Sequence, residues 1–127
     1  MDILITNNSQ TPIYKQIVNQ VKEAILKGVL SEGEQMPSMR KLAKDLQISL
    51  ITTKHAYEEL EKEGLIISMT GKGSFISSNN LEALKEVRLN EIEKHFEKGI
   101  LLAKSINLTK DEVIEIFEII FGEVNYD

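Results

Sequence analysis

The sequence predicts a mostly α-helical protein with one small β-hairpin. Apolar-periodic segments on either side of Gln47-Ile48-Ser49 predict a short helix, a tight turn and a longer helix over 36–63. Two β-prone runs around a glycine-containing turn at 70–73 predict the hairpin. Apolar residues then recur at helical spacing from Leu81 onward. Together these features predict a winged helix-turn-helix domain over 1–79 and a two-helix tail over 80–127.

Length and composition fit one small domain with an appendage. The chain has 127 residues, of which 42% are hydrophobic and 28% charged, as in ordinary soluble globular proteins. No run approaches the roughly 18–20 apolar residues that cross a bilayer. The start, MDILITNNSQ, lacks the basic and apolar regions of a signal peptide. We therefore expect a cytoplasmic protein without a membrane segment. Because there is no cysteine, disulfides and thiolate metal sites are excluded.

The formal net charge of −5 arises entirely in the tail. Residues 1–79 contain nine Lys or Arg and nine Asp or Glu, whereas residues 80–127 contain six and eleven. In the first segment the acidic side chains crowd the far end of the longer helix, at Glu58, Glu59, Glu61 and Glu63. The cations lie nearer the tight turn and at the hairpin tip: Arg40, Lys41, Lys44, Lys54 and Lys72. A local basic face can bind phosphates even when the total charge is negative.

The N-terminal region predicts an arm followed by a helix. Residues 1–10 have the character of a loose arm, in which Ile3-Leu4-Ile5 is either a short strand or a docking segment. Thr11 is the expected N-cap, and Pro12 the expected first helical residue, where its missing N–H costs nothing. The expected buried stripe repeats every four residues: Ile13, Ile17, Val21 and Ile25. Gly28 is the expected stop.

The central segment predicts the helix-turn-helix itself. Ser38 is the expected N-cap of the shorter helix, whose apolar stripe is Leu42, Ala43 and Leu46. Ser49 is the expected N-cap of the longer helix, which runs to about Glu63 before Gly64. A short helix, a tight turn and a longer helix are typical of proteins that read DNA, although small helical domains of other functions also contain such pairs.

The hairpin tip carries one lysine between two glycines. Gly71 and Gly73 permit positive φ and close approach to another backbone. Lys72 is therefore either a solvated turn lysine or a cation that reaches a phosphate or the minor groove. The preceding helices favour the second interpretation.

The segment from Pro12 to Ser77 resembles the N-terminal domain of the GntR family of bacterial transcription regulators. Four motifs carry the resemblance in the same order: residues 12–17 (PIYKQI), 36–43 (MPSMRKLA), 56–66 (AYEELEKEGLI) and 71–75 (GKGSF). The resemblance implies sequence-specific operator binding as a homodimer, usually in a repressor. The tail is too short for the large effector domains of many members, and looks like that of the YtrA-type subfamily.

The resemblance also implies roles for individual residues. Arg40 matches an arginine early in the shorter helix, and the wing tip matches at Lys72 and Gly73. The expected DNA-binding set is Ser38, Arg40, Lys41, Ser49, Leu50, Ile51, Thr52, Thr53, Lys54, Lys72 and Gly73. Gln47 departs from the family's glycine, at a cost of roughly 1 kcal/mol if it is left-handed. Leu50 and Ile51 stand where many members of the family have polar or basic residues. Either one of them packs into the core or against the wing, or they make apolar contact with thymine methyl groups.

The tail predicts two amphipathic helices, one from Leu81 to about Ile106 and one after Thr109. Thr109 and Glu112 have the spacing of a capping box. The expected dimerisation residues lie on the apolar faces: Leu89, Ile92, Phe96, Ile100, Ile116, Phe117, Ile120 and Phe121. Two helices cannot bury this surface between themselves, so we expect an isologous homodimer. The phenylalanines are either plain core or the lining of a pocket for a small apolar effector.

Two function classes other than DNA binding fit the sequence less well. An enzyme is disfavoured because the chain has two histidines, no cysteine, and no phosphate loop, metal-ligand cluster or nucleophile motif. We therefore expect no catalytic residue, no metal and no cofactor. The alternative to a regulator is a winged-helix module that binds only other proteins. Arg40 and the cationic wing tip count against it.

Overall fold

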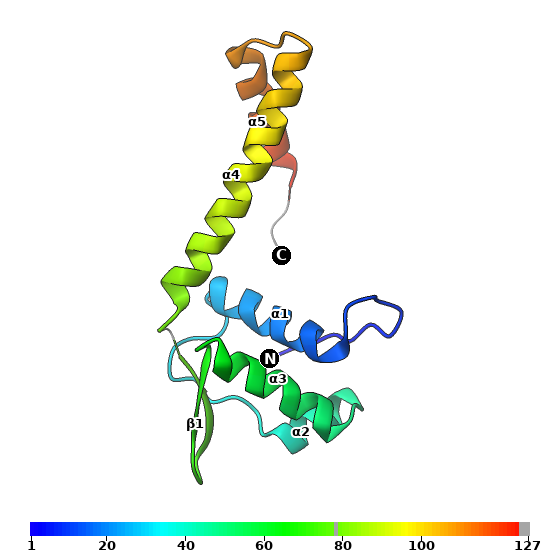
Figure 1. Cartoon of the computed structure of the whole chain (residues 1–127), viewed down its shortest axis with the longest axis vertical. Coiled ribbons are helices and arrows are strands. Elements are labelled where there is room, and N and C mark those ends of the chain that lie inside the picture. The colour runs from blue at the N-terminus through cyan, green and yellow to red at the C-terminus, as the bar shows by residue number, and fades with distance from the viewer. Residues whose placement is uncertain (78, 125–127) are drawn as a thin grey trace. The chain divides into compact units, whose positions relative to one another are not determined.

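The computed structural model describes residues 1–77 and 79–124 and confirms the predicted fold class (Figure 1). These residues form α1 (Ile13–Leu26), α2 (Met39–Leu46), α3 (Leu50–Lys62), β1 (Ile66–Met69), β2 (Gly73–Ile76), α4 (Leu81–Ser105) and α5 (Lys110–Glu123). They divide into two compact units, Met1–Lys85 and Glu86–Asp127, and the division falls inside α4. The functional boundary between residues 79 and 80 stays a prediction.

The core of the N-terminal unit is built around α3. Both α1 and α2 pack on α3, and so does β1. The stripe predicted on α1 is buried at Ile17, Val21 and Ile25 and half-buried at Ile13. The buried face of α3 consists of Thr53, Ala56, Tyr57 and Leu60. Because three elements hold one side of α3, its opposite side is presented in a fixed orientation.

The predicted start of α1 was wrong by one residue. Pro12 is the N-cap, with φ −55° and ψ 150°, and no side chain caps this end. The Pro12 carbonyl accepts the first helical hydrogen bond, from the Gln16 N–H at 3.1 Å. Thr11 contributes its carbonyl instead of its hydroxyl, accepting from Gln16 Nε2 at 2.9 Å. The Thr11 hydroxyl therefore does not cap α1, and the Gln16 side chain instead ties the Thr11 carbonyl to the first turn.

The caps of the helix-turn-helix are as predicted. The Ser38 side chain accepts a hydrogen bond from the Lys41 N–H, and the Ser49 side chain accepts one from the Thr52 N–H. Between the helices, Gln47 lies in the left-handed region with φ 56° and ψ 47°. A residue other than glycine there carries a conformational cost of about 1 kcal/mol.

The wing is wider than the predicted hairpin. Strands β1 and β2 pair antiparallel, with Ile66 opposite Ile76. Residues 33–36 run beside β2, with an isolated antiparallel bridge between Gln35 and Phe75. Three main-chain hydrogen bonds of 2.8 Å join them: Gly33 N–H to the Ile76 carbonyl, Ile76 N–H to the Glu34 carbonyl, and Met36 N–H to the Ser74 carbonyl. The wing is thereby tied to the loop that leads into α2.

The N-terminal arm docks on α1 without forming a strand. Ile3 is buried in the core. The Gln20 amide pairs with both main-chain groups of Leu4, accepting from its N–H at 2.9 Å and donating to its carbonyl at 2.6 Å. Gln16 pairs with Thr6 in the same way, with both distances 2.9 Å. Of the two interpretations of this arm, docking is the one the structure supports.

The C-terminal unit is a helical hairpin in which α5 folds back along α4 (Figure 1). The capping box is confirmed: Thr109 Oγ1 accepts from the Glu112 N–H at 3.2 Å, and Glu112 Oε1 accepts from the Thr109 N–H at 2.9 Å. The hydrogen bond from the Thr109 main-chain N–H lowers the pKa of the Glu112 carboxyl group, and the hydrogen bond from the Thr109 hydroxyl lowers it further. No described helix in the chain is long and apolar enough to cross a membrane.

Candidate nucleic-acid interface

The first turn of α3 presents aliphatic side chains to solvent. Ile51 is 81% exposed and Leu50 is 39% exposed, so Ile51 does not pack into the core. Ser49 lies at the N-cap, and its Oγ donates to Thr52 Oγ1 at 2.8 Å. Lys54, one turn further along, is exposed. The start of the helix predicted to read DNA is therefore accessible to a ligand. Thr52 is half-buried, and the other residues named here are exposed.

Thr53 is a correction to the predicted DNA-binding set. Its side chain is fully buried, and its Oγ1 donates to the Ser49 carbonyl at 3.1 Å. A ligand on the surface of α3 cannot reach it. Thr53 shares the inward face with Ala56 and Leu60, at helical spacings of three and seven residues, and this spacing was readable in the sequence.

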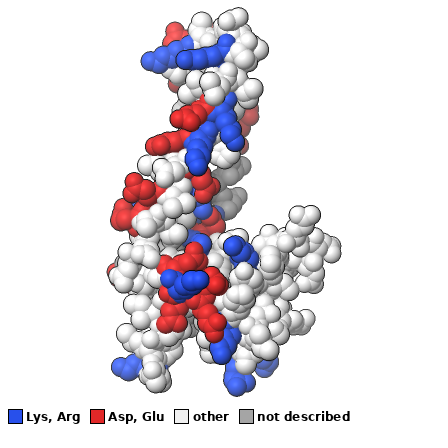
Figure 2. Space-filling view, in the orientation of Figure 1, with Lys and Arg blue, Asp and Glu red and all other residues white. Residues whose placement is uncertain are grey.

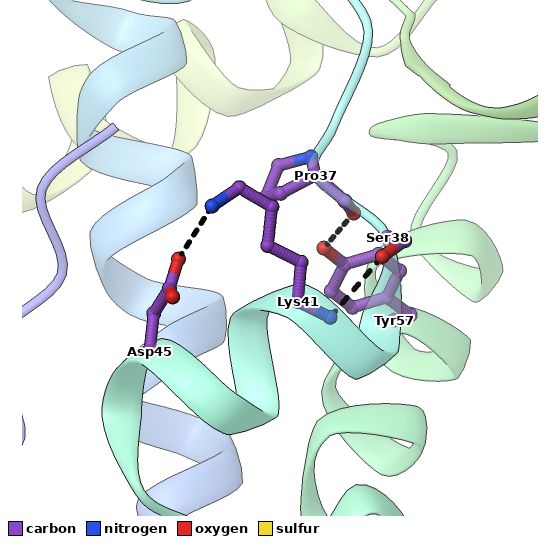
Figure 3. Close-up of polar contacts among 5 residues, drawn as sticks. All are labelled: Pro37, Ser38, Lys41, Asp45 and Tyr57. Atoms are coloured by element: carbon purple, nitrogen blue, oxygen red, sulfur yellow. Dashed lines mark hydrogen bonds and ion pairs between the residues drawn. The ribbon is translucent and has the colours of Figure 1, made fainter.

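The start of α2 supplies two cations, Arg40 and Lys41, while the Ser38 side chain is already engaged as the N-cap. Ser38 Oγ accepts from the Lys41 N–H at 3.1 Å, and Lys41 Nζ forms an ion pair with Asp45 at 3.1 Å (Figure 3). Arg40 is exposed, and among the described residues no carboxylate lies within ion-pair distance of it. Arg40 is therefore better placed than Lys41 to bind a phosphate.

Tyr57 joins the two helices of the motif, a role that the sequence did not indicate. Its hydroxyl donates to the Pro37 carbonyl at 2.6 Å, and the residue is 2% exposed (Figure 3). Burial raises the pKa of the Tyr57 hydroxyl well above its ordinary value of 10.0, so it remains a donor. Burial of Tyr57 could be read from its place on the inward stripe, but its partner, twenty residues away, could not.

The wing tip is held by Gln35, another contact that the sequence did not indicate. Lys72 and Gly73 are exposed. Gln35 Nε2 donates to the Lys72 carbonyl at 3.1 Å and lies where a side chain on Gly73 would stand, 2.9 Å from an added Cβ. Gly73 also has a φ of +107°, which other residues rarely adopt. Gly73 is therefore required by the wing's own geometry, whether or not it touches DNA.

Acidic and basic groups are separated along the N-terminal unit. On the face shown in Figure 2, Lys and Arg side chains lie at its lower end, where the wing tip and α2 lie in Figure 1, and a group of Asp and Glu side chains lies above them. Residues 49–57 contain no carboxylate, whereas the last turns of α3 and its C-cap contain four: Glu58, Glu59, Glu61 and Glu63. The end of α3 that is free of carboxylates can approach a polyanion.

His55 has a structural neighbour on α1. Its ring stacks on Tyr14 with centroids 3.7 Å apart and an interplanar angle of 17°. Its Nε2 lies 3.9 Å from Glu59 Oε1. His55 therefore helps to seat α3 on α1, which the sequence did not indicate.

The predicted dimerisation residues line an apolar groove in the C-terminal unit. All eight are exposed within one chain, from 43% for Ile92 and Ile100 to 74% for Phe121. All except Leu89 line a groove of about 950 Å³, and Phe117 lies between Phe96 and Phe121 with ring centroids 6.2 and 5.5 Å away. Among the residues that the structure describes, His95 is the one titratable side chain in this lining, and no cluster suited to a metal ion is present.

A family model matches half of the chain. The model for bacterial regulatory proteins of the gntR family matches residues 13–76, which include the helix-turn-helix and the wing. The Bacillus subtilis (strain 168) protein named HTH-type transcriptional repressor YtrA is 35% identical over 122 residues, covering 96% of this chain and 94% of that protein. The similarity therefore extends through the tail as well as the N-terminal unit.

Solved structures agree with the sequence comparison. A transcriptional regulator from Oenococcus oeni has a TM-score of 0.70 and 27% identity, covering 92% of this chain and 97% of that one. YtrA from Sulfolobus acidocaldarius, a GntR-family transcription factor, has a TM-score of 0.58 and 35% identity, covering 72% of this chain and 97% of that one. The fold and the sequence point to the same group of transcription regulators.

Proposed function

Because the chain belongs to the GntR family of bacterial regulatory proteins, we propose that it is a transcriptional repressor that binds an inverted-repeat operator as a homodimer in the cytoplasm. The sign of regulation is inferred from the similar Bacillus subtilis protein, which is named a repressor. The observation that carries the proposal is the start of α3, which is exposed, free of carboxylates and accompanied by Arg40 and Lys72.

In this proposal α3 enters the major groove by its first turns. Four residues of that end face the base edges: Leu50, Ile51, Thr52 and Lys54. The cations of α2 and the wing, together with main-chain groups at Ser38, Ser49 and Gly73, contact the phosphates on either side. The acidic end of α3 points away from the DNA, because carboxylates near phosphates would be repelled.

The homodimer in this proposal forms through the C-terminal unit. The apolar groove of a single chain is a contiguous apolar surface, and soluble monomers rarely leave a large surface of this kind exposed to water. A second copy buries this surface by the same residues on both sides, which is the isologous arrangement of a two-fold dimer. Two reading helices related by that axis match an inverted repeat.

A small apolar effector is the alternative occupant of the groove. Its lining is nearly all aliphatic and aromatic, so a ligand that entered it would be apolar and would compete with the dimer contact. Such a ligand would release the operator by separating the protomers. Loss of operator binding on dilution alone, without any added compound, is what the homodimer proposal predicts.

The test begins with a DNA sequence selected from a pool of random duplexes by the full-length chain. Fluorescence anisotropy then gives the affinity for that duplex and for a scrambled duplex at several salt concentrations. Replacement of Arg40 and Lys72 by alanine removes about four phosphate contacts per dimer, which lowers the log–log salt slope by about 3.6. Lys98→Ala, which removes an exposed lysine from α4, is the matched control and keeps the wild-type slope.

Two results would count against the proposal. If the variant with both substitutions kept full affinity and slope, the assignment of the DNA-binding face would be wrong. If no sequence were enriched from the pool, the winged-helix domain would be a module for protein contacts instead.

A further inference from the structure

We propose that Ile51 contacts the 5-methyl group of a thymine in each operator half-site and so determines part of the sequence specificity. This role rests on the proposed function, since it requires the start of α3 to lie in the major groove. Ile51 lies in the first turn of α3, the turn that follows the Ser49 cap, and is 81% exposed. It is the most exposed aliphatic residue of the helix-turn-helix.

The neighbouring side chains leave few other ways to read a base. Residues 49–55 are Ser-Leu-Ile-Thr-Thr-Lys-His, without the Arg, Asn or Gln that bond bidentately to guanine or adenine and without the carboxylates that accept from cytosine. Thr53 is buried, and the Thr52 hydroxyl accepts from Ser49. Lys54 and His55 are the remaining exposed side chains that can form hydrogen bonds, and the His55 ring is stacked on Tyr14. Most of the accessible surface in the first turn is therefore aliphatic.

An aliphatic surface in the major groove has one complementary group. The thymine methyl is the only methyl group among the base edges there, and the other three bases are recognised mainly through hydrogen-bond donors and acceptors. A single exposed isoleucine is common on protein surfaces and needs no explanation by itself. Here it occupies the turn that a winged helix places against bases, beside a second partly exposed aliphatic residue, Leu50.

The side chain is also suited to the contact by its stiffness. An isoleucine in a helix holds one χ1 rotamer in about 90% of cases, so little conformational freedom is lost when it meets the methyl group. Burial of one methyl group strengthens binding by about fourfold. Two equivalent contacts in a symmetric dimer would strengthen it by about sixteenfold.

The experiment replaces thymine by uracil, which lacks only the methyl group, at each position of the selected operator in turn. The full-length wild type is expected to lose about fourfold in affinity at one position per half-site, and about sixteenfold when both half-sites are changed. Ile51→Ala is expected to bind the thymine and uracil duplexes equally. The variant should remain folded, because the side chain is exposed and alanine favours helices.

Two further variants make the assignment specific. Val29→Ala shortens an exposed aliphatic residue of the loop after α1 and should retain the full sensitivity to uracil. Leu50→Ala tests whether the second partly exposed aliphatic residue of the same turn makes the contact instead. If the wild type bound both duplexes alike at every position, or if Ile51→Ala kept the wild-type sensitivity, the inference would be overturned.

A failure of the inference differs from a failure of the proposed function. A selected sequence without any uracil effect would overturn the role of Ile51 and leave the repressor intact. The absence of a selected sequence would overturn both. Sensitivity that disappeared only in Leu50→Ala would transfer the contact to Leu50 and remove it from Ile51.

Discussion

Replacement of Tyr57 by phenylalanine removes the hydroxyl that joins α3 to the loop before α2. The bond to the Pro37 carbonyl is 2.6 Å long, and the tyrosine is 2% exposed. Phenylalanine keeps the ring and therefore its packing against the core. The substitution isolates the hydrogen bond and leaves the Pro37 carbonyl without this donor.

The expected loss of stability is about 1.5 kcal/mol. A hydrogen bond contributes about 0.5–1.5 kcal/mol net, and a buried acceptor left without a donor costs about 1–3 kcal/mol. Because Pro37 is half-buried, water can partly replace the donor, which favours the lower part of this range. For a unit of this size the melting temperature should fall by about 6–12 °C.

The pH dependence provides a second measure of the same group. Burial raises the pKa of Tyr57 above its ordinary value of 10.0, so the folded chain holds the proton more tightly than the unfolded chain. The contribution of this raised pKa to the free energy of unfolding is fully present below about pH 10. It is lost as the pH rises further, by up to about 1.4 kcal/mol per pH unit. Phenylalanine has no proton to lose. The difference in stability between wild type and variant should therefore narrow above pH 10.

Urea and thermal unfolding, followed by circular dichroism from pH 7 to 11, measure both effects. Tyr14→Phe is the matched control, since Tyr14 is half-buried and makes its contact through its ring, stacked on His55. Equal melting temperatures for wild type and Tyr57→Phe at pH 7 would refute the contribution of the hydrogen bond. A difference that stayed constant above pH 10 would refute the part assigned to burial.

Two more substitutions test other parts of the chain. Gln47→Gly should raise the free energy of unfolding by about 1 kcal/mol in urea denaturation, because residue 47 has a φ of 56°; a lower stability would contradict the assigned turn geometry. Phe117→Ala should weaken the dimer about a thousandfold in sedimentation velocity, since its 45% exposed fraction leaves about 2 kcal/mol per protomer for the partner to bury. Leu101 is 68% exposed and lies outside the groove lining, so Leu101→Ala should leave the dimer affinity unchanged. If both variants weakened the dimer equally, the groove would not be the dimer contact.

Features set by neighbouring residues could be predicted from the sequence. Ser38, Ser49 and Thr109 cap helices because each side chain bonds to an N–H three residues ahead, and residue type and spacing suffice to indicate such a bond. The glycines of the wing were indicated by the same local logic, because a tight turn needs positive φ.

Contacts between distant segments could not be predicted in this way. Tyr57 meets Pro37, and Gln35 meets Lys72, only after the helices and the wing have packed together. The position of Thr53 is a different case, because its spacing to Ala56 and Leu60 placed it on the inward stripe, and its polar character obscured this. Side-chain polarity was a weaker guide than periodicity there.

The pairing of Gln16 and Gln20 with the arm makes one face of α1 behave like the edge of a β-sheet. Four residues of helix rise about 6 Å, and two residues of extended chain rise about 6.6 Å, so two amides one turn apart match alternate peptide groups. Within the arm the amides bond to main-chain atoms of Leu4 and Thr6 and not to their side chains, and the Leu4 side chain is 79% exposed. Substitutions at residues 4 and 6 therefore leave these hydrogen bonds intact. An insertion or deletion between Ile3 and Thr6 would instead shift the peptide groups by about 3.3 Å, out of step with both amides.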